Sequence, residues 1–392
     1  MEVRRLVFRT RRGLLLAILA CMSPLASANP EPADEVMFAG ASYAVDAAQV
    51  AQRFPLVSQV VGAGSGQEPS AFERQLREAV LAATPRQFAI SNRDPFHQSD
   101  TRSGVAKALS MAFSHEAVEL QQLGSKTVAV YDIAAQVLFF DYGAAAKHVI
   151  AAYPVRLRYT DTTDRPPSPA QRQAVVRTML DPASESGLVR VWLRKMVEAA
   201  PRGGDRLVRV ELPVFEAKAA AMQDGEGAAH DVARFLEGVI SDEWNVPMVP
   251  RSTGQAISGK MVQVFANGDA AEFELPEPTF RIGTTVRDLR KAVSPLEGGQ
   301  RVAYGAFITS AVQGPLGTIA ELRFKDVLSV TLTDLEPVRL DDRKQLARTL
   351  QSVLVQSVGQ VKARDRSWTE ANSTTPDANA QLDAIRTRLL AR

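Results

Sequence analysis

Hydrophobic positions along this chain follow two spacings, one typical of strands and one typical of helices. Residues 126–141 and 147–161 are rich in Val, Ile, Tyr and Phe and flank Tyr142-Gly143, which predicts an antiparallel ribbon. Residues 302–312 and 318–332 repeat this arrangement around a Gly-Pro-Leu-Gly turn. Each ribbon is followed by a polar break and a helical segment. The pattern predicts an α+β fold of two lobes, each with antiparallel β-ribbons packed against helices.

Helical spacing is clearest where Phe72, Leu76 and Val80 follow Ser70, a favourable N-cap residue. A short hairpin is predicted around Asn267-Gly268, because both residues tolerate positive φ. Further helices are predicted at residues 44–54, 103–113, 169–180, 185–200, 228–244 and 341–362. Shorter strands are predicted at residues 36–43, 206–215, 260–266, 270–275 and 280–293.

The double glycine at 203–204 separates the two halves of the chain. We therefore predict an N-terminal α+β domain at 29–202 and a C-terminal α+β domain at 205–366, followed by a linker and amphipathic helix at 367–392. Both halves place a long ribbon before a helix, which suits a diverged internal duplication. The same order of elements also recurs in unrelated α+β folds, so both explanations stay open.

The first 28 residues predict an export signal. Five arginines precede an apolar run at residues 13–20, and Ala26-Ser27-Ala28 suits cleavage by signal peptidase after Ala28. This favours a periplasmic mature protein. Two alternatives remain: acylation of Cys21 in a lipoprotein box, which would anchor the protein to a membrane surface, and twin-arginine export through Arg11-Arg12. No later stretch approaches the ~20 apolar residues of a transmembrane helix.

Composition narrows the class of protein. The formal net charge is +2 for the whole chain, and it falls to about −2 without the five arginines and one glutamate of the signal. A nearly neutral surface disfavours nucleic-acid binding. Cys21 is the only cysteine, so the mature fold contains no internal disulfide. Arginines outnumber lysines 36 to 10, a usage that we associate with bacteria of high genomic GC content.

Motifs for metal, cofactor or nucleophile chemistry are missing. The four histidines, His97, His115, His148 and His230, include no pair at i, i+4 spacing, so we predict no metal site and interpret them as solvated or edge-strand residues. No nucleophile elbow is present. The glycines at 62–66 do not directly begin a helix after a strand, and we interpret them as a linker without a cofactor.

Paired carboxylates are the remaining route to an enzyme, because glycoside hydrolysis needs only two suitably spaced acids. Asp141, Asp161 and Asp164 lie at ribbon ends, and Asp341-Asp342 begins a helix. Turn formation and N-capping explain these positions structurally. The three tryptophans, Trp192, Trp244 and Trp368, could line a sugar site, but two lie on predicted helices, where a buried anchor is more usual. A carboxylate-dependent envelope hydrolase of glycan or peptidoglycan is therefore the alternative function.

The C-terminal helix is the candidate interaction element. Leu382, Ile385 and Leu389 form an apolar stripe after a polar stretch at 370–379, and such a short helix needs something to pack against. Docking on a partner protein and packing on its own domain are equally compatible with this pattern. Together these observations favour an exported, non-catalytic accessory, scaffolding or binding protein of the bacterial cell envelope, with a protein partner.

Overall fold

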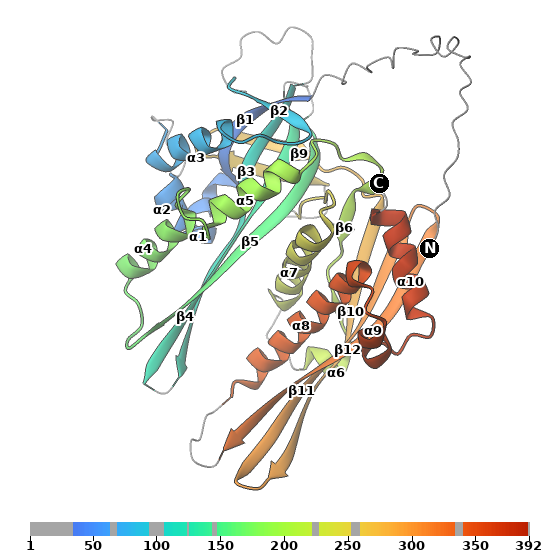
Figure 1. The fold of residues 1–392 in the computed structure, drawn as a ribbon. Helices are drawn as coiled ribbons and strands as arrows, with labels where there is room; N and C mark the ends of the chain where they lie inside the picture. Colours follow the sequence, from blue (N-terminus) through green and yellow to red (C-terminus); the bar gives the residue numbers. More distant parts are fainter. Residues whose placement is uncertain are drawn as a thin grey trace, which may run out of the picture. The chain divides into compact units, whose positions relative to one another are not determined.

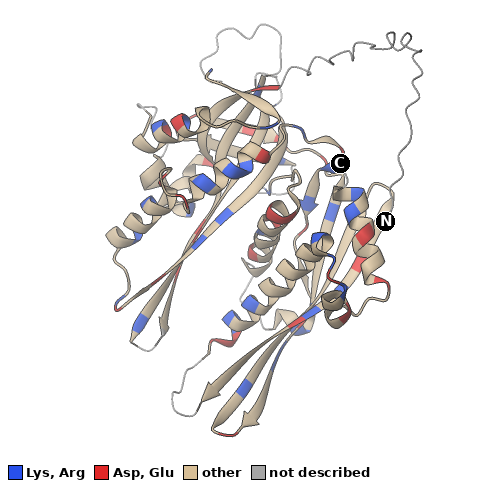
Figure 2. Ribbon diagram, in the orientation of Figure 1, with Lys and Arg blue, Asp and Glu red and all other residues tan. Residues whose placement is uncertain are grey.

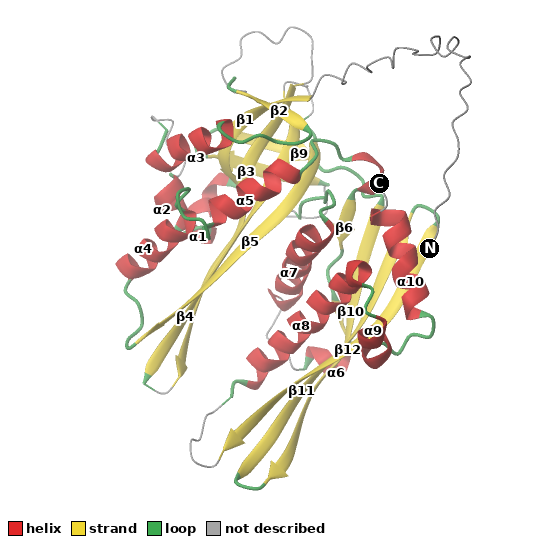
Figure 3. Cartoon of the chain, viewed as in Figure 1, coloured by secondary structure: helices red, strands yellow, loops and turns green. Residues whose placement is uncertain are grey.

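A computed structural model describes residues 34–62, 69–93, 106–123, 125–142, 147–221, 227–251, 259–333 and 340–390. These residues form two β-sheets, one of seven strands and one of five, with helices packed against each (Figures 1 and 3). The predicted α+β class is therefore confirmed. The predicted signal at 1–28 lies outside the described residues. Within these ranges, no helix has both the length and the apolar composition needed to cross a membrane.

Sheet 1 is built around a meander of three long strands. β3, β4 and β5 pair antiparallel in chain order, which confirms the first predicted ribbon. The strand order is β5-β4-β3-β1-β8-β9, and β1 pairs in parallel with both β3 and β2. The bounds are β1 (Asp34–Tyr43), β2 (Phe88–Ser91), β3 (Ala106–Leu123), β4 (Lys126–Tyr142), β5 (Val149–Thr163), β8 (Lys260–Phe265) and β9 (Ala270–Glu274).

The helix predicted at 103–113 is wrong, because β3 begins at Ala106. Leu109, Met111 and Phe113 face one core cluster, while Ala108 and Ala112 face another. A strand buried on both faces loses the alternation of polar and apolar residues that would identify it. Its alanine content then resembles that of a helix.

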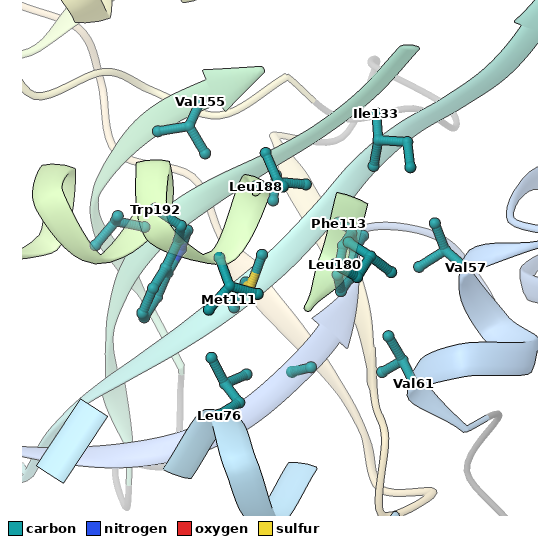
Figure 4. Packing of buried hydrophobic residues seen from close by; sticks show 14 of the residues in the cluster. Val57, Val61, Leu76, Met111, Phe113, Ile133, Val155, Leu180, Leu188 and Trp192 are labelled. Atoms are coloured by element: carbon teal, nitrogen blue, oxygen red, sulfur yellow. The ribbon is translucent and has the colours of Figure 1, made fainter. Parts of the chain in front are cut away.

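Helices cover one face of sheet 1, which we call its helical face (Figures 1 and 3). The Ser70 side chain accepts a hydrogen bond from the Glu73 backbone N–H at the start of α3, and Ser168 forms a capping box with Gln171 at the start of α4. Figure 4 shows Leu76, Leu180, Leu188 and Trp192 of the helices packed with Met111 and Phe113 of β3. The helices are α1 (Val50–Arg53), α2 (Val57–Val61), α3 (Ala71–Leu81), α4 (Pro169–Leu180) and α5 (Leu188–Glu198).

Sheet 2 has a second meander of three long strands. β10, β11 and β12 pair antiparallel, which confirms the second predicted ribbon. The order is β12-β11-β10-β6, and β6 and β7 both pair with β10 in parallel. The bounds are β6 (Val208–Val210), β7 (Val214–Phe215), β10 (Phe280–Leu296), β11 (Gly299–Gly314) and β12 (Gly317–Thr333).

Helices also cover one face of sheet 2, its helical face. Leu236 and Ile240 of α7 and Leu350 and Leu354 of α8 pack with Phe324 of β12 in one buried cluster. Asp341 caps α8, because its side chain accepts a hydrogen bond from the Lys344 backbone N–H. The helices are α6 (Ala217–Ala220), α7 (Gly227–Trp244), α8 (Asp342–Ala363), α9 (Arg366–Asn372) and α10 (Ala378–Ile385).

The two sheets share the order of four strands, since β5-β4-β3-β1 in sheet 1 corresponds to β12-β11-β10-β6 in sheet 2. In each, a short strand pairs in parallel with the first strand of an antiparallel meander. Each meander also has a register irregularity at the same place in its first strand, between Phe113 and His115 in β3 and between Val286 and Asp288 in β10. The strands of the two sheets can therefore be matched residue by residue.

Backbone hydrogen bonds connect the two sheets. The Met248 N–H donates to the Ala152 carbonyl at 2.8 Å, and the Val249 N–H donates to the Val208 carbonyl at 2.8 Å. The β8–β9 hairpin, predicted around Asn267-Gly268, forms as expected, but it pairs with β1 of sheet 1. The division into domains at 29–202 and 205–366 stays a prediction, and Met248 forms isolated bridges with both Ala152 of sheet 1 and Val208 of sheet 2.

The C-terminal segment is more regular than predicted. Residues 367–372, expected as part of the linker, belong to helix α9. Leu382, Ile385 and Leu389 have 4%, 2% and 0% of their surface exposed and belong to the core cluster of sheet 2. Their predicted partner-binding role is not tested by this placement, but it would require the segment to leave that core.

Candidate functional site

An open groove of about 850 Å³ lies between helices α7 and α8 and the half of the β3–β4–β5 ribbon that is near the β3–β4 turn. One wall is the face of the ribbon opposite its helical face, and the other consists of the first turns of both helices. The described residues that line it are His115, Ala117, Glu119, Leu120, Gln121, Val130, Asp132, Arg156, Arg158, Gly227, Ala228, Asp231, Val232, Asp341, Arg343, Lys344, Ala347, Arg348, Leu350 and Gln351. We call this the inter-lobe groove.

A polar network closes one end of the groove. Arg234 of α7 bonds to the Nδ1 atom of His115 and to Asp231 at 3.1 Å. Arg156 pairs with Asp132 through two hydrogen bonds, and its guanidinium lies 5.5 Å from the Phe235 ring centre. An arginine and a carboxylate that share two hydrogen bonds hold each other in fixed orientations. The network therefore links α7 to sheet 1.

His115 is uncharged in this setting. Burial, together with the positive charge of Arg234, lowers the pKa of His115 to about 4. A neutral imidazole nitrogen can accept a hydrogen bond from an arginine, so the uncharged form of His115 is the form that can bond to Arg234. We interpreted His115 as a solvated or edge-strand residue. It lies on β3 beyond the part that pairs with β1, and it is partly buried against α7.

Cations dominate the remaining lining of the groove. Arg158 on β5 and Arg348 on α8 are exposed, and neither makes an ion pair with any described residue. Lys344 makes a 3.4 Å contact with Gln121. Figure 2 shows blue segments along β5 and along the first turns of α8. Unpaired arginines on both walls favour binding of an anionic group.

Most acidic side chains of the groove already have structural roles. Asp132 pairs with Arg156, Asp231 pairs with Arg234, and Asp341 caps α8. Glu119 is exposed at the groove. The carboxylates needed for glycoside hydrolysis should face each other with a water or substrate between them. The groove does not offer such a pair among the residues that the structure places.

Acids with raised pKa values lie elsewhere. Burial raises the pKa of Glu73 to about 7, and its Oε1 accepts a 2.8 Å hydrogen bond from the Ala41 N–H. Burial also raises the pKa of Glu237, which pairs with Arg251 at 2.9 Å. Each carboxylate satisfies a buried donor, so its position has a structural explanation.

The other residues singled out from the sequence are scattered. Trp192 and Trp244 are buried anchors, each donating from Nε1 to a backbone carbonyl, of Gln136 and Val358 respectively, at 3.0 Å. Trp368 packs on Phe324. Among the described residues, no cluster of three His, Cys, Asp or Glu could hold a metal. Cys21, His97 and the linker at 63–66 lie outside the described residues.

The groove arginines were missed from the sequence. Arg156 and Arg158 occupy alternate positions of a strand, so they share a face. Lys344 and Arg348 occupy i, i+4 positions of α8 and also share a face. Each of these two patterns can be recognised in the sequence by itself. Only the placement of α8 beside the first ribbon shows that the two faces line one groove.

Comparisons with known proteins give little further information. No protein-family model matches the chain, and no curated protein matches it. Among solved structures, a minor lipoprotein from Acinetobacter baumannii is similar at 12% sequence identity, over 44% of this chain and 97% of that chain, with a TM-score of 0.22. At this TM-score the similarity carries no argument about fold or function.

Proposed function

We propose that this protein is an exported, non-catalytic accessory or binding component of the bacterial cell envelope, and that the inter-lobe groove binds an acidic segment of a protein partner. Export is supported by the arginine-rich, apolar N-terminus with its Ala-Ser-Ala site. The mature protein is periplasmic in this proposal. The alternative localisation is a membrane surface, with the protein anchored through acylated Cys21.

One observation carries the binding site. Arg158 and Arg348 lie on opposite walls of one groove, exposed and without ion-pair partners among the described residues. Apolar side chains of the same groove, such as Val130, Val232 and Leu350, offer contact area beside these charges. An extended peptide with carboxylates and a few aliphatic residues matches both features.

A photocrosslinking experiment tests the proposal. Ala347→benzoylphenylalanine in the groove should give an adduct with a specific envelope protein in cells, attached within an acidic stretch. The double variant Arg158→Glu with Arg348→Glu should lose the adduct, because both cations become repulsive. A matched control, Arg190→Glu with Arg194→Glu, reverses two exposed arginines on α5, away from the groove.

The proposal fails if the adduct survives reversal in the groove, or if the control removes it equally. Release of peptidoglycan fragments by the purified protein, abolished by Glu119→Gln, would instead support the hydrolase alternative.

A further inference from the structure

The last strand of sheet 2, β12, lies at an edge of that sheet, with β11 as its neighbour on one side. The C-terminal segment covers the first part of the other side. There the Arg323 N–H donates to Thr375 Oγ1 at 2.8 Å, and the Arg323 carbonyl accepts from the Thr374 N–H at 3.0 Å. The Glu321 N–H donates to Gln381 at 2.7 Å. The protein thus protects this part of the edge with its own chain.

The rest of the edge, residues 327–333, has no strand beside it among the described residues. We call it the distal edge of β12. Every second residue of an antiparallel strand directs its N–H and C=O to the same side. Because Arg323 faces the free side and the pairing with β11 continues without a shift, Ser329 and Thr331 face it too. The Asp326 carboxylate accepts the Val327 N–H at 2.8 Å, so the available backbone groups begin at Ser329.

The composition of the distal edge favours strand pairing. Residues 327–333 read Val-Leu-Ser-Val-Thr-Leu-Thr, with no charge, proline or glycine. Val327 has 55% of its surface exposed and Leu328 has 37%.

Native proteins usually protect exposed edges with charged residues or proline. The edge strand β5 and the part of β10 beyond its pairing with β7 have such residues: Arg156, Arg158, Asp161, Arg290, Lys291 and Pro295. The distal edge of β12 differs from both of these edges, which indicates that it is paired when the protein functions.

The alternation within the distal edge makes it complementary to itself. Leu328, Val330 and Leu332 share one side of the strand, and Ser329 and Thr331 share the other. An antiparallel pair of two copies, with its two-fold axis at Val330, places Ser329 opposite Thr331 and Leu328 opposite Leu332. The aliphatic rows of the two copies then meet on one side, and the hydroxyl rows meet on the other.

The charges near the distal edge also suit this arrangement. Lys325 and Asp326 immediately precede it. In an antiparallel pair they lie at opposite ends of the junction, so like charges do not face each other. A strand of another protein that was selected by its charge would find no opposite charge on residues 327–333. A second copy of this chain is therefore the occupant that the sequence of the edge fits.

We propose that two copies of this chain associate through the distal edge of β12, as an antiparallel strand pair with its two-fold axis at Val330. Ser329 and Thr331 exchange backbone hydrogen bonds across the axis. The same patch serves both copies, as a two-fold interface requires. None of these residues lines the inter-lobe groove, so this interface is correct or wrong independently of the function proposed above.

A cysteine scan in the full-length exported protein tests the register. Val330→Cys should give a disulfide-linked dimer on mild oxidation, because residue 330 faces itself across the axis at a Cα–Cα distance of about 4.5 Å, within the range of a disulfide. Leu328→Cys alone should not, because its two copies lie four residues apart, about 13 Å. A mixture of Leu328→Cys and Leu332→Cys proteins should cross-link. The wild type, with Cys21 as its only cysteine, gives the background.

Sedimentation equilibrium of the purified protein measures the association itself. Ser329→Lys with Thr331→Lys should raise the dissociation constant of the dimer at least about tenfold, because the introduced charges face each other across the axis. The matched control, Ala292→Lys with Ser294→Lys, adds the same charge to exposed positions of β10 in the same ribbon and should leave the dimer unchanged.

Thermal unfolding of each variant checks that the fold is intact. If the distal-edge lysine variant unfolds early, the cysteine scan decides the question, because its substitutions add no charge. A monomer at every concentration, a dimer that the distal-edge lysines do not weaken, or equal cross-linking of Leu328→Cys and Val330→Cys would each overturn the proposal. A disulfide from Val330→Cys to a different protein would overturn it as well.

Discussion

Leu389→Ala tests whether the C-terminal segment belongs to the core. Leu389 has 0% of its surface exposed and packs with Leu382 and Ile385 in the cluster on the helical face of sheet 2. Removing a buried leucine side chain costs the transfer free energy of the lost atoms and leaves a cavity, together about 2–5 kcal/mol. We expect a loss of about 3 kcal/mol in the free energy of unfolding. For a docking helix held away from the core, the same substitution would leave the free energy of unfolding almost unchanged.

Urea unfolding of the purified mature protein measures this loss, with intrinsic fluorescence reporting on the nearby Trp244 and Trp368. The control is Val355→Ala on α8, an aliphatic residue with 41% of its surface exposed, for which the expected change is within about 0.5 kcal/mol. A loss below about 1 kcal/mol for Leu389→Ala would refute the structural placement and favour a free, partner-binding helix. Because the protein has two sheets, the unfolding curve must first be shown to follow a single transition.

Three further outcomes are expected. The N-terminus of envelope-derived protein should be Asn29 by N-terminal sequencing, and a lipid-modified Cys21 would contradict this. Thermal unfolding should not change on adding a reductant, because Cys21 is the only cysteine and a single cysteine forms no disulfide within the chain. Since the folded protein raises the pKa of Glu73 from 4.5 to about 7, its contribution to stability is full below pH 4.5 and falls as the pH rises toward 7. Glu73→Gln should flatten that part of the stability profile measured by urea unfolding, and an unchanged slope would count against the buried carboxylate.

The sequence predicts local elements well where one face meets solvent. Helix α4 has the bounds predicted from the sequence, 169–180, and the two ribbons follow from their β-branched content and turns. The helix predicted at 103–113 fails for the opposite reason: residues 106–113 of β3 contact two cores, so no polar face marks them. Burial on both sides removes the signal that distinguishes a strand from a helix.

Longer-range placement was not predictable from one sequence. The hairpin around Asn267-Gly268 is identified from its turn, but nothing in its residues indicates that β8 pairs with β1. The stripe of Leu382, Ile385 and Leu389 identifies a helix and an apolar face, but the same stripe suits a core and a partner equally. The groove arginines require knowledge of which helix face meets which strand face.

Binding of an acidic partner segment in the inter-lobe groove can be measured directly. Once photocrosslinking has identified that segment, isothermal titration of the corresponding peptide into purified protein measures its dissociation constant directly. We expect Arg158→Glu with Arg348→Glu to weaken binding at least about tenfold and Arg190→Glu with Arg194→Glu to leave it unchanged. Equal dissociation constants for the wild type and the groove variant would show that the groove arginines do not bind the segment.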